Sequence, residues 1–194
     1  MDLYLHRANC FEQLERAHTY GWGVEIDVRS HLGRLFLHHD AIEAADLSSI
    51  VPLAKYLEKA EDWGVPVILD MKESNLAPLV RLELFQSGRT KNDAGVFDGL
   101  VATDLMVFDQ LQYEDLGIRT LTRMSCYEQP KGHKSYGFWH DYSHLGACHI
   151  IGENIFLVSS ELHGVELTED YITAMNAYNY VGVCTDYPNR WMHR

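Results

Sequence analysis

The sequence lacks the features of a membrane-embedded chain and of a nucleic-acid-binding chain. Its longest apolar runs are far shorter than the roughly 20 residues that a membrane-spanning helix needs, and it has no internal repeat. Its 16 lysine and arginine residues are outnumbered by 28 acidic residues, and the formal net charge is −12. This charge argues against nucleic acid, whose phosphates need many cations. A small anionic substrate needs only a metal ion or a few placed basic side chains.

Cysteines are few and widely spaced, at Cys10, Cys126, Cys148 and Cys184. They show no metal-binding pairing, and we interpret them as reduced and mostly buried. The N-terminal segment MDLYLHRANC has no basic stretch followed by an apolar core, so it shows no secretory signal. From both observations we expect a cytoplasmic protein.

What the sequence does contain is an alternation of short strand-like runs and helical periods. Its 194 residues suffice for one domain with a substantial core, and we expect a single domain over residues 1–194. Strands that alternate with helices imply a parallel sheet, whose closure gives an α/β fold of the (βα)8 TIM-barrel type. Since that fold typically has about 250 residues, we expect a compact barrel with some shortened crossovers. An open doubly wound sheet would give a similar pattern.

The expected elements follow from apolar spacing and from start and stop signals. The clearest helix spans residues 48–64, with a serine cap, an early Pro52 and Gly64 at its end. Ser74 is expected to cap the next helix, and Thr168 the last one, through Tyr178. Other helices are expected at 11–20 and about 105–116, and strands at 3–7, 24–28, 34–40, 65–72, 98–104, 118–125, 136–142, 154–162 and 181–188.

Polar side chains stand at the ends of many of these strands. His6 and Arg7 end the first strand, and Glu25 and Asp27 lie late in the second. A barrel carries its functional groups at the C-terminal ends of its strands, whereas an open sheet has no such reason to place acids there, so the pattern favours the barrel. The other members of the set are His39, Asp40, Asp70, Lys72, Asp104, Glu161 and Asp186.

Three of these acids are candidates for a metal site. Side chains two apart on a strand point to the same face, so Glu25 projects with Asp27, and Asp70 projects with Lys72. If the two strands are neighbours, the three carboxylates converge and repel one another unless a positive group lies among them. A divalent cation such as Mg²⁺ or Ca²⁺ prefers carboxylate oxygens. The alternative for any one acid is a simple ion pair with Lys72 or Arg7.

Histidines form the second part of the expected site. His6 ends the first strand, and LFLHHD places His38 and His39 at the end of a run that pairs with the second strand or extends it. Alternation puts the two neighbours on opposite faces and does not say which faces inward. Two imidazoles beside a metal could act as general base and general acid near neutral pH.

These stretches together resemble the glycerophosphodiester phosphodiesterase family, in the phospholipase C-like phosphodiesterase superfamily. The resemblance is carried, in order, by LHR, GVEIDV, LHHD, ILDMK and the closing VGVCTDYP. It implies a (βα)8 barrel that binds one divalent cation, Mg²⁺ or Ca²⁺, and hydrolyses phosphodiesters. The implied acid/base pair is His6 and His39, and the implied metal ligands are Glu25, Asp27 and Asp70, the last in place of a more usual glutamate.

The resemblance also implies a substrate site, with departures around it. Arg7 and Lys72 would hold the phosphate oxygens, the guanidinium being suited to bidentate contact. We expect Trp139, late in its strand, to line the mouth. Ala8 stands where a glycine is usual, a Glu-Asn-Thr run is absent, and the seventh strand lacks a Trp-Thr pattern. These departures concern the part of the site that would hold the glycerol.

We therefore expect a phosphoric diester hydrolase that uses a metal ion and acts on a glycerophosphodiester or a similar small phosphodiester. The sequence leaves open the leaving alcohol, the choice between Mg²⁺ and Ca²⁺, a cyclic phosphate intermediate and the oligomeric state. One alternative is a catalytically silent barrel that binds a phosphorylated sugar or lipid head group. Another is a hydrolase of C–N bonds, which normally carries two close histidines on its first strand, where LHRAN supplies one.

Overall fold

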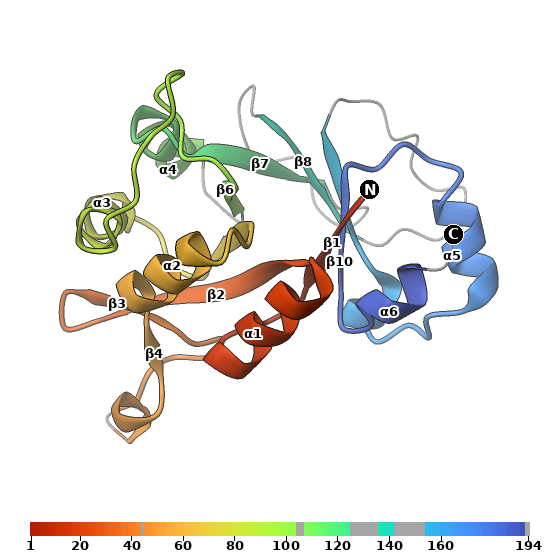
Figure 1. The fold of residues 1–194 in the computed structure, drawn as a ribbon, viewed down its shortest axis with the longest axis horizontal. Coiled ribbons are helices and arrows are strands. Elements are labelled where there is room, and N and C mark those ends of the chain that lie inside the picture. Colours follow the sequence, from red (N-terminus) through yellow and green to blue (C-terminus); the bar gives the residue numbers. More distant parts are fainter. Residues whose placement is uncertain (44, 104–106, 125–135, 142–153, 193–194) are drawn as a thin grey trace.

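Eight parallel strands close into a barrel in the computed structural model, which describes residues 1–43, 45–103, 107–124, 136–141 and 154–192. They are β1 (Asp2–Leu5), β2 (Gly23–His31), β5 (Val67–Met71), β6 (Leu100–Thr103), β7 (Arg119–Met124), β8 (Gly137–His140), β9 (Ile155–Val158) and β10 (Gly182–Thr185). The ring runs β1-β10-β9-β8-β7-β6-β5-β2, and pairing of β1 with β2 closes it (Figure 1). The predicted (βα)8 barrel is confirmed, because an open sheet would leave β1 and β2 unpaired.

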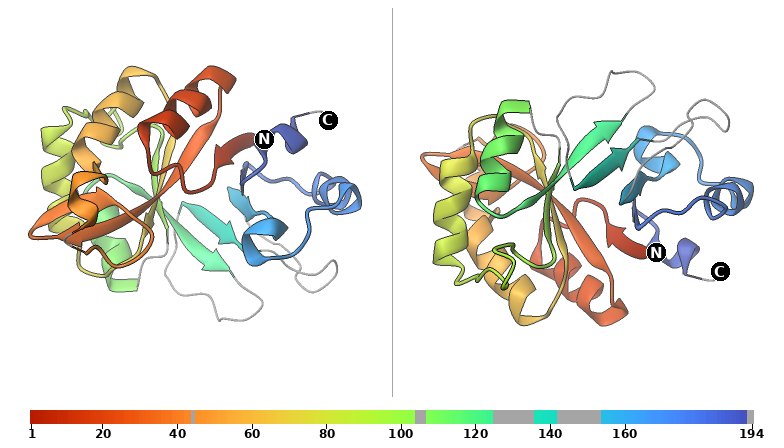
Figure 2. Two further views of the ribbon diagram at one scale, coloured as in Figure 1. Left: turned by 90° about the horizontal axis from the view of Figure 1, so that it is seen from below. Right: turned by 90° about the horizontal axis from the view of Figure 1, so that it is seen from above.

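Helices surround the barrel unevenly. They are α1 (Phe11–Tyr20), α2 (Leu53–Asp62), α3 (Ala77–Gln86), α4 (Val107–Asp115), α5 (Glu169–Met175) and α6 (Pro188–Trp191), with short 3₁₀ turns at Asp46–Ser48 and Ser160–His163. Figure 2 shows α1 to α4 around one side and α5 and α6 on the other. Residues 125–136 join β7 to β8, and residues 141–154 join β8 to β9, so these crossovers are short, as expected; most of both lies outside the described residues.

A hairpin outside the ring brings the chain back toward the barrel mouth. β3 (Arg34–Leu37) pairs with β2 in antiparallel fashion, and β4 (Val51–Pro52) pairs with β3. Leu32 and Gly33 form the two-residue turn with φ of 48° and 76°, the positive values of a type I′ hairpin. The run that ends in LHHD therefore pairs with the second strand rather than extending it, and the residues after Leu37 return beside Asp27.

Two of the three predicted helix caps are wrong. Residues Val51–Pro52 are held extended by β3, so α2 begins only at Leu53, and no serine caps it. After Ser74, Asn75 has a φ of 63°, which is not helical, and α3 begins at Ala77. The third cap is confirmed, because the side chain of Thr168 accepts a hydrogen bond from the Tyr171 N–H.

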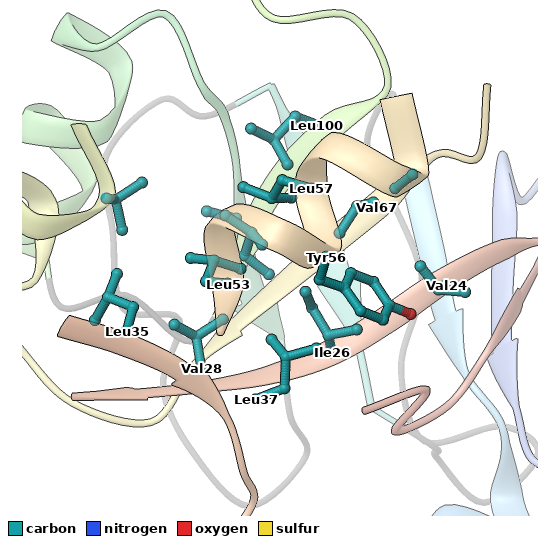
Figure 3. Packing of buried hydrophobic residues seen from close by; sticks show 14 of the residues in the cluster. Val24, Ile26, Val28, Leu35, Leu37, Leu53, Tyr56, Leu57, Val67 and Leu100 are labelled. Atoms are coloured by element: carbon teal, nitrogen blue, oxygen red, sulfur yellow. The ribbon is translucent and has the colours of Figure 1, made fainter. Parts of the chain in front are cut away.

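Alternation along the strands separates an outer core from the barrel interior. Val24, Ile26 and Val28 of β2 face outward and pack beneath Leu53 and Tyr56 of α2 (Figure 3). The interior is filled by a separate cluster that contains Tyr4, Ile68, Val101, Leu121, Trp139, Phe156, Val158 and Cys184. Since the outward residues of β2 alternate with Glu25 and Asp27, this packing points both acids into the barrel.

Two further expectations concern cysteines and membranes. Cys10 and Cys184 are free thiols, while Cys126 and Cys148 lie outside the described residues. Within the described ranges, no helix combines the length and apolarity needed to cross a bilayer.

Gly23 lets the barrel close around a large side chain. It pairs with Tyr4 across the β1–β2 seam, and a Cβ at Gly23 would lie 2.4 Å from the Tyr4 ring. We predict that Gly23→Ala lowers the free energy of unfolding by about 1–3 kcal/mol, as overpacking does, in urea denaturation. Adding Tyr4→Leu should recover part of this loss. A double-mutant cycle without coupling would contradict the steric cause.

Candidate active site

Three buried carboxylates meet where β2 and β5 run side by side. The register pairs Asp27 with Asp70 and Glu25 with Ile68, and alternation turns all three acids into the barrel. Glu25, Asp27 and Asp70 are buried, and each offers a carboxylate oxygen within 4.8 Å of the others. The structure therefore brings together the three acids that the strand pattern singled out.

One lysine lies among these acids. Lys72 Nζ is 2.9 Å from Asp27 Oδ1 and 2.5 Å from Asp70 Oδ2. Burial alone would lower the pKa of Lys72, but the attraction of Asp70 and Asp27 outweighs it, and the pKa is raised. Burial raises the pKa of Glu25 well above its usual range, and repulsion by Asp70 and Asp27 raises it further. The ion-pair alternative thus holds for the two aspartates, because Lys72 contacts both and Arg7 Nε lies 3.9 Å from Asp27 Oδ2. Three buried carboxylates then share two cations, of which only Lys72 is close.

The donor set fits a hard divalent cation. Three carboxylates supply oxygen ligands, which Mg²⁺ and Ca²⁺ prefer, and no sulfur or imidazole ligand is needed. Three carboxylates against Lys72 and the more distant Arg7 leave negative charge in excess at this point. A cation there would offset the repulsion that burial and proximity impose. Of the described residues, only these three bring three possible metal ligands so close together.

The turn after β1 wraps around these acids. Arg7 has a φ of 48°, a left-handed conformation that is uncommon outside glycine, and its N–H donates to Glu25 Oε2 at 2.7 Å. Asn9 Nδ2 donates to Asp27 Oδ2 at 2.7 Å, and the Asp27 N–H donates to Asn9 Oδ1 at 2.9 Å. Sequence reasoning missed Asn9, whose signal was its position two residues after the His-Arg pair.

His39 reaches the same turn from the hairpin. The His38 N–H donates to the Asp27 carbonyl at 3.1 Å, which ties the end of β3 to the acid cluster. Arg7 Nη2 lies 2.6 Å from His39 Nε2, and because arginine can only donate, this ring nitrogen is the acceptor. Nδ1 then carries the proton and donates to Asp40 Oδ1 at 2.8 Å. His38 instead contacts the Asp40 carbonyl through Nδ1 at 2.9 Å.

His6 is oriented by a second carboxylate. Its Nδ1 lies 2.9 Å from Asp186 Oδ1, across the β1–β10 pair. Burial lowers the pKa of His6, and the hydrogen bond and charge of Asp186 partly offset this effect. Glu161 in turn accepts from the Asp186 N–H at 3.1 Å, from Ser159 Oγ at 2.5 Å and from Thr185 Oγ1. Asp186 stood among the strand-end acids in the sequence, but its link to His6 was not predicted.

The far wall of the mouth is built differently. Trp139 is only 6% exposed and packs in the interior cluster with Tyr4 and Phe156, so its expected contact with a substrate stays a prediction. One position beyond β8, Asp141 accepts from Arg123 Nε at 2.8 Å. Arg123 and Asp141 are thus charged residues on the side of the mouth opposite the three acids.

Comparisons with known proteins support the architecture. No protein-family model matches the chain, and no curated protein matches it. Two chains of solved structures match, one of which is a candidate glycerophosphoryl diester phosphodiesterase from Silicibacter pomeroyi DSS-3. The TM-score is 0.59 at 11% identity, over 98% of this chain and 91% of that one. The two proteins share a fold. That neighbour is of the kind that the motifs resemble, and at this identity the likeness extends to the fold alone.

The protonation of Glu25 makes stability depend on pH. Its pKa is higher in the folded chain than the ordinary 4.5, so the unfolded chain releases this proton first, and stability falls as pH rises above 4.5. We predict that Glu25→Gln flattens this fall above pH 4.5 in thermal unfolding of the metal-free protein. Glu43→Gln, at an exposed position, is the control and should keep the slope. Equal slopes in wild type and Glu25→Gln would contradict the prediction.

Proposed function

We propose that residues 1–194 form one phosphodiesterase domain of the glycerophosphodiester phosphodiesterase family, which hydrolyses a small phosphodiester. The observation that carries the proposal is the meeting of Glu25, Asp27 and Asp70 within 4.8 Å, with Arg7 and Lys72 beside them. The motif resemblance and the shared barrel fold support it. A cytoplasmic location stays a prediction.

In this proposal the three carboxylates hold one divalent cation, Mg²⁺ or Ca²⁺. When bound, such an ion polarises a phosphate oxygen and lowers the pKa of a hydroxyl nucleophile. Asn9 fixes the orientation of Asp27 through its two hydrogen bonds, as residues behind metal ligands commonly do. The shorter Asp70 is compatible with this role because its strand places it directly beside Asp27.

Basic side chains neutralise the phosphate. The guanidinium of Arg7 is half-exposed, with donors directed at the mouth region where His39 lies, and it suits two phosphate oxygens. Lys72 already lies among the acids and contributes a positive charge next to them. Charge that develops on the phosphate oxygens during attack is stabilised by these two groups.

The two histidines move the protons. His39 presents an unprotonated Nε2, held by the Asp40 contact at Nδ1, and we assign it as the acceptor of the nucleophile's proton. His6, oriented by Asp186 at Nδ1, is assigned as the donor to the leaving alcohol, from Nε2 of its protonated form. The nucleophile is water or a neighbouring hydroxyl of the substrate, and the latter would give a cyclic phosphate first.

The function is tested by an assay of glycerophosphodiesters and a chromogenic phosphodiester with Mg²⁺, with Ca²⁺ or after EDTA treatment. We expect turnover with at least one metal and none after EDTA, because removal of the cation leaves the acids to repel the phosphate. Asp70→Asn should reduce the metal-dependent rate by about 10²-fold or more. Absence of turnover of every diester with either metal would overturn the proposal and favour a barrel that only binds phosphorylated ligands.

The two adjacent histidines provide a matched pair of variants. His39→Ala should lower kcat by about 10²–10⁴-fold, the usual contribution of a general base, because it removes the proposed base. Of His38 and His39, it is His39 whose ring contacts Arg7. His38→Ala removes a contact to the Asp40 carbonyl and should change kcat far less. Steady-state kinetics on the best diester compare them. If His38→Ala is the more damaging change, the assignment of His39 is wrong.

A further inference from the structure

A pocket lies between α3 and α4, at the opposite end of the barrel from the three acids. We call it the α3–α4 pocket. Its volume of about 460 Å³ is within the range of small-ligand sites. Its walls come from α3, from the chain that leads into β6 and from the chain that leads into β7. Those segments precede their strands, whereas catalytic groups of a barrel follow their strands. Figure 1 shows the two helices side by side.

The α3–α4 pocket is basic, although the chain as a whole is acidic. Arg81, Arg89 and Lys91 line it, against one acid, Asp115. Arg81 and Lys91 are exposed and form no ion pair with any residue that the structure describes. Three cations against two acids, Asp115 in the pocket wall and Glu61 beside Arg89, leave a local excess of positive charge in a chain of net charge −12. This excess attracts anions locally.

Arg89 is the unusual member of this group. Its side chain is 3% exposed, and its Nε lies 2.9 Å from Glu61 Oε2, a carboxylate that is half-exposed. Its Nε is buried and meets Glu61 without the geometry of a hydrogen bond, and its buried Nη1 has no hydrogen-bond partner among the residues that the structure describes. Burial lowers the pKa of Arg89, and Glu61 only partly offsets this. A buried guanidinium with so few acceptors is costly unless something else supplies them.

The rest of the pocket is apolar. Phe97 is buried, with the Lys91 ammonium 5.6 Å from its ring centre, and Leu84 is buried beside it. Phe85 stands at the rim and is 84% exposed. A ligand that matches both the basic and the apolar part of the pocket has an anionic group for the three cations. It also has an apolar body that packs against the phenylalanine and leucine side chains. The pocket's size favours a small molecule over a protein segment.

We propose that the α3–α4 pocket binds a small organic anion, with its phosphate or carboxylate at Arg81, Arg89 and Lys91 and its apolar part against Phe97. The anion supplies the oxygen acceptors that Arg89 lacks, and its charge is matched by the two exposed cations. The site is separate from the phosphodiesterase mouth and does not depend on its chemistry.

The test is a calorimetric titration of the full chain with hexyl phosphate and, separately, with hexanoate. Metal is first removed from the protein with EDTA, and the EDTA is then removed. We expect one of these anions to bind with a stoichiometry of one and to raise the melting temperature, while hexanol does not bind. Inorganic phosphate should bind about tenfold or more weakly, because it lacks the apolar part. The better of the two anions identifies the head group. Binding of neither anion, or equal binding of hexanol, overturns the proposal.

Variants locate the bound anion. The double variant Arg81→Gln Lys91→Gln should raise Kd about tenfold or more, whereas Arg16→Gln Arg34→Gln, an equal loss of charge outside the pocket, should leave it unchanged. Arg89→Met should abolish binding if that variant folds; the exposed double variant decides the matter if it does not. Arg7→Gln, a change at the phosphodiesterase mouth, should bind the anion as tightly as the wild type does. Binding that survives Arg81→Gln Lys91→Gln, or that is lost in Arg7→Gln, overturns the proposal, whatever the diesterase assay shows.

Discussion

The repulsion among three buried carboxylates is the constraint around which the mouth of this barrel is arranged. Apolar packing imposes it, because the outward face of β2 lies against α2 and thereby fixes which residues point inward. A slip of one residue would bury Glu25 and Asp27 among leucines and turn Ile26 into the barrel. The same contacts that stabilise the fold therefore hold like charges within 4.8 Å. Such an arrangement persists only where the surroundings over-determine it.

The surrounding polar groups respond to this excess of negative charge. Lys72 lies between the two aspartates, the Arg7 N–H points at Glu25, and Asn9 presents its amide to Asp27. Holding the Arg7 N–H there requires a left-handed backbone at a residue with a large side chain. That strain coincides with the residue whose guanidinium also contacts His39. One turn thus links the acids of β2 to the imidazole that returns on the hairpin.

Much of this arrangement could be predicted from local spacing. Residues two apart share a face, so the joint projection of Glu25 and Asp27 needed only the period of a strand, and a barrel needed only the alternation of elements. The adjacency of β2 and β5 was a condition of the prediction, and the structure supplies it. Helix starts at residues 48 and 74 failed because the short strand β4 and the turn at Asn75 override cap preference.

What spacing could not give were contacts between residues far apart in sequence. Asp186 meets His6 across a sequence separation of 180 residues, and only closure of the ring makes them neighbours. The inward face of LFLHHD depended on the register of the two-residue turn at Leu32 and Gly33; the glycine indicates a turn, but not its register. The basic pocket was invisible for the same reason, since Arg89 and Arg81 acquire their setting only when α3 packs beside α4.

The two ends of the barrel differ in the sign of charge that they bury. At the mouth, three acids outnumber the cations beside them; at the opposite end, Arg89 is buried while its partner Glu61 is half-exposed. Between them lies an interior cluster of Tyr4, Trp139, Phe156 and other apolar side chains. Residues at this end of a barrel usually contribute to stability and not to catalysis. Stability does not explain the buried Arg89, because an apolar side chain of similar size would pack there at lower cost. Its presence is better explained by an anion that completes its hydrogen bonds.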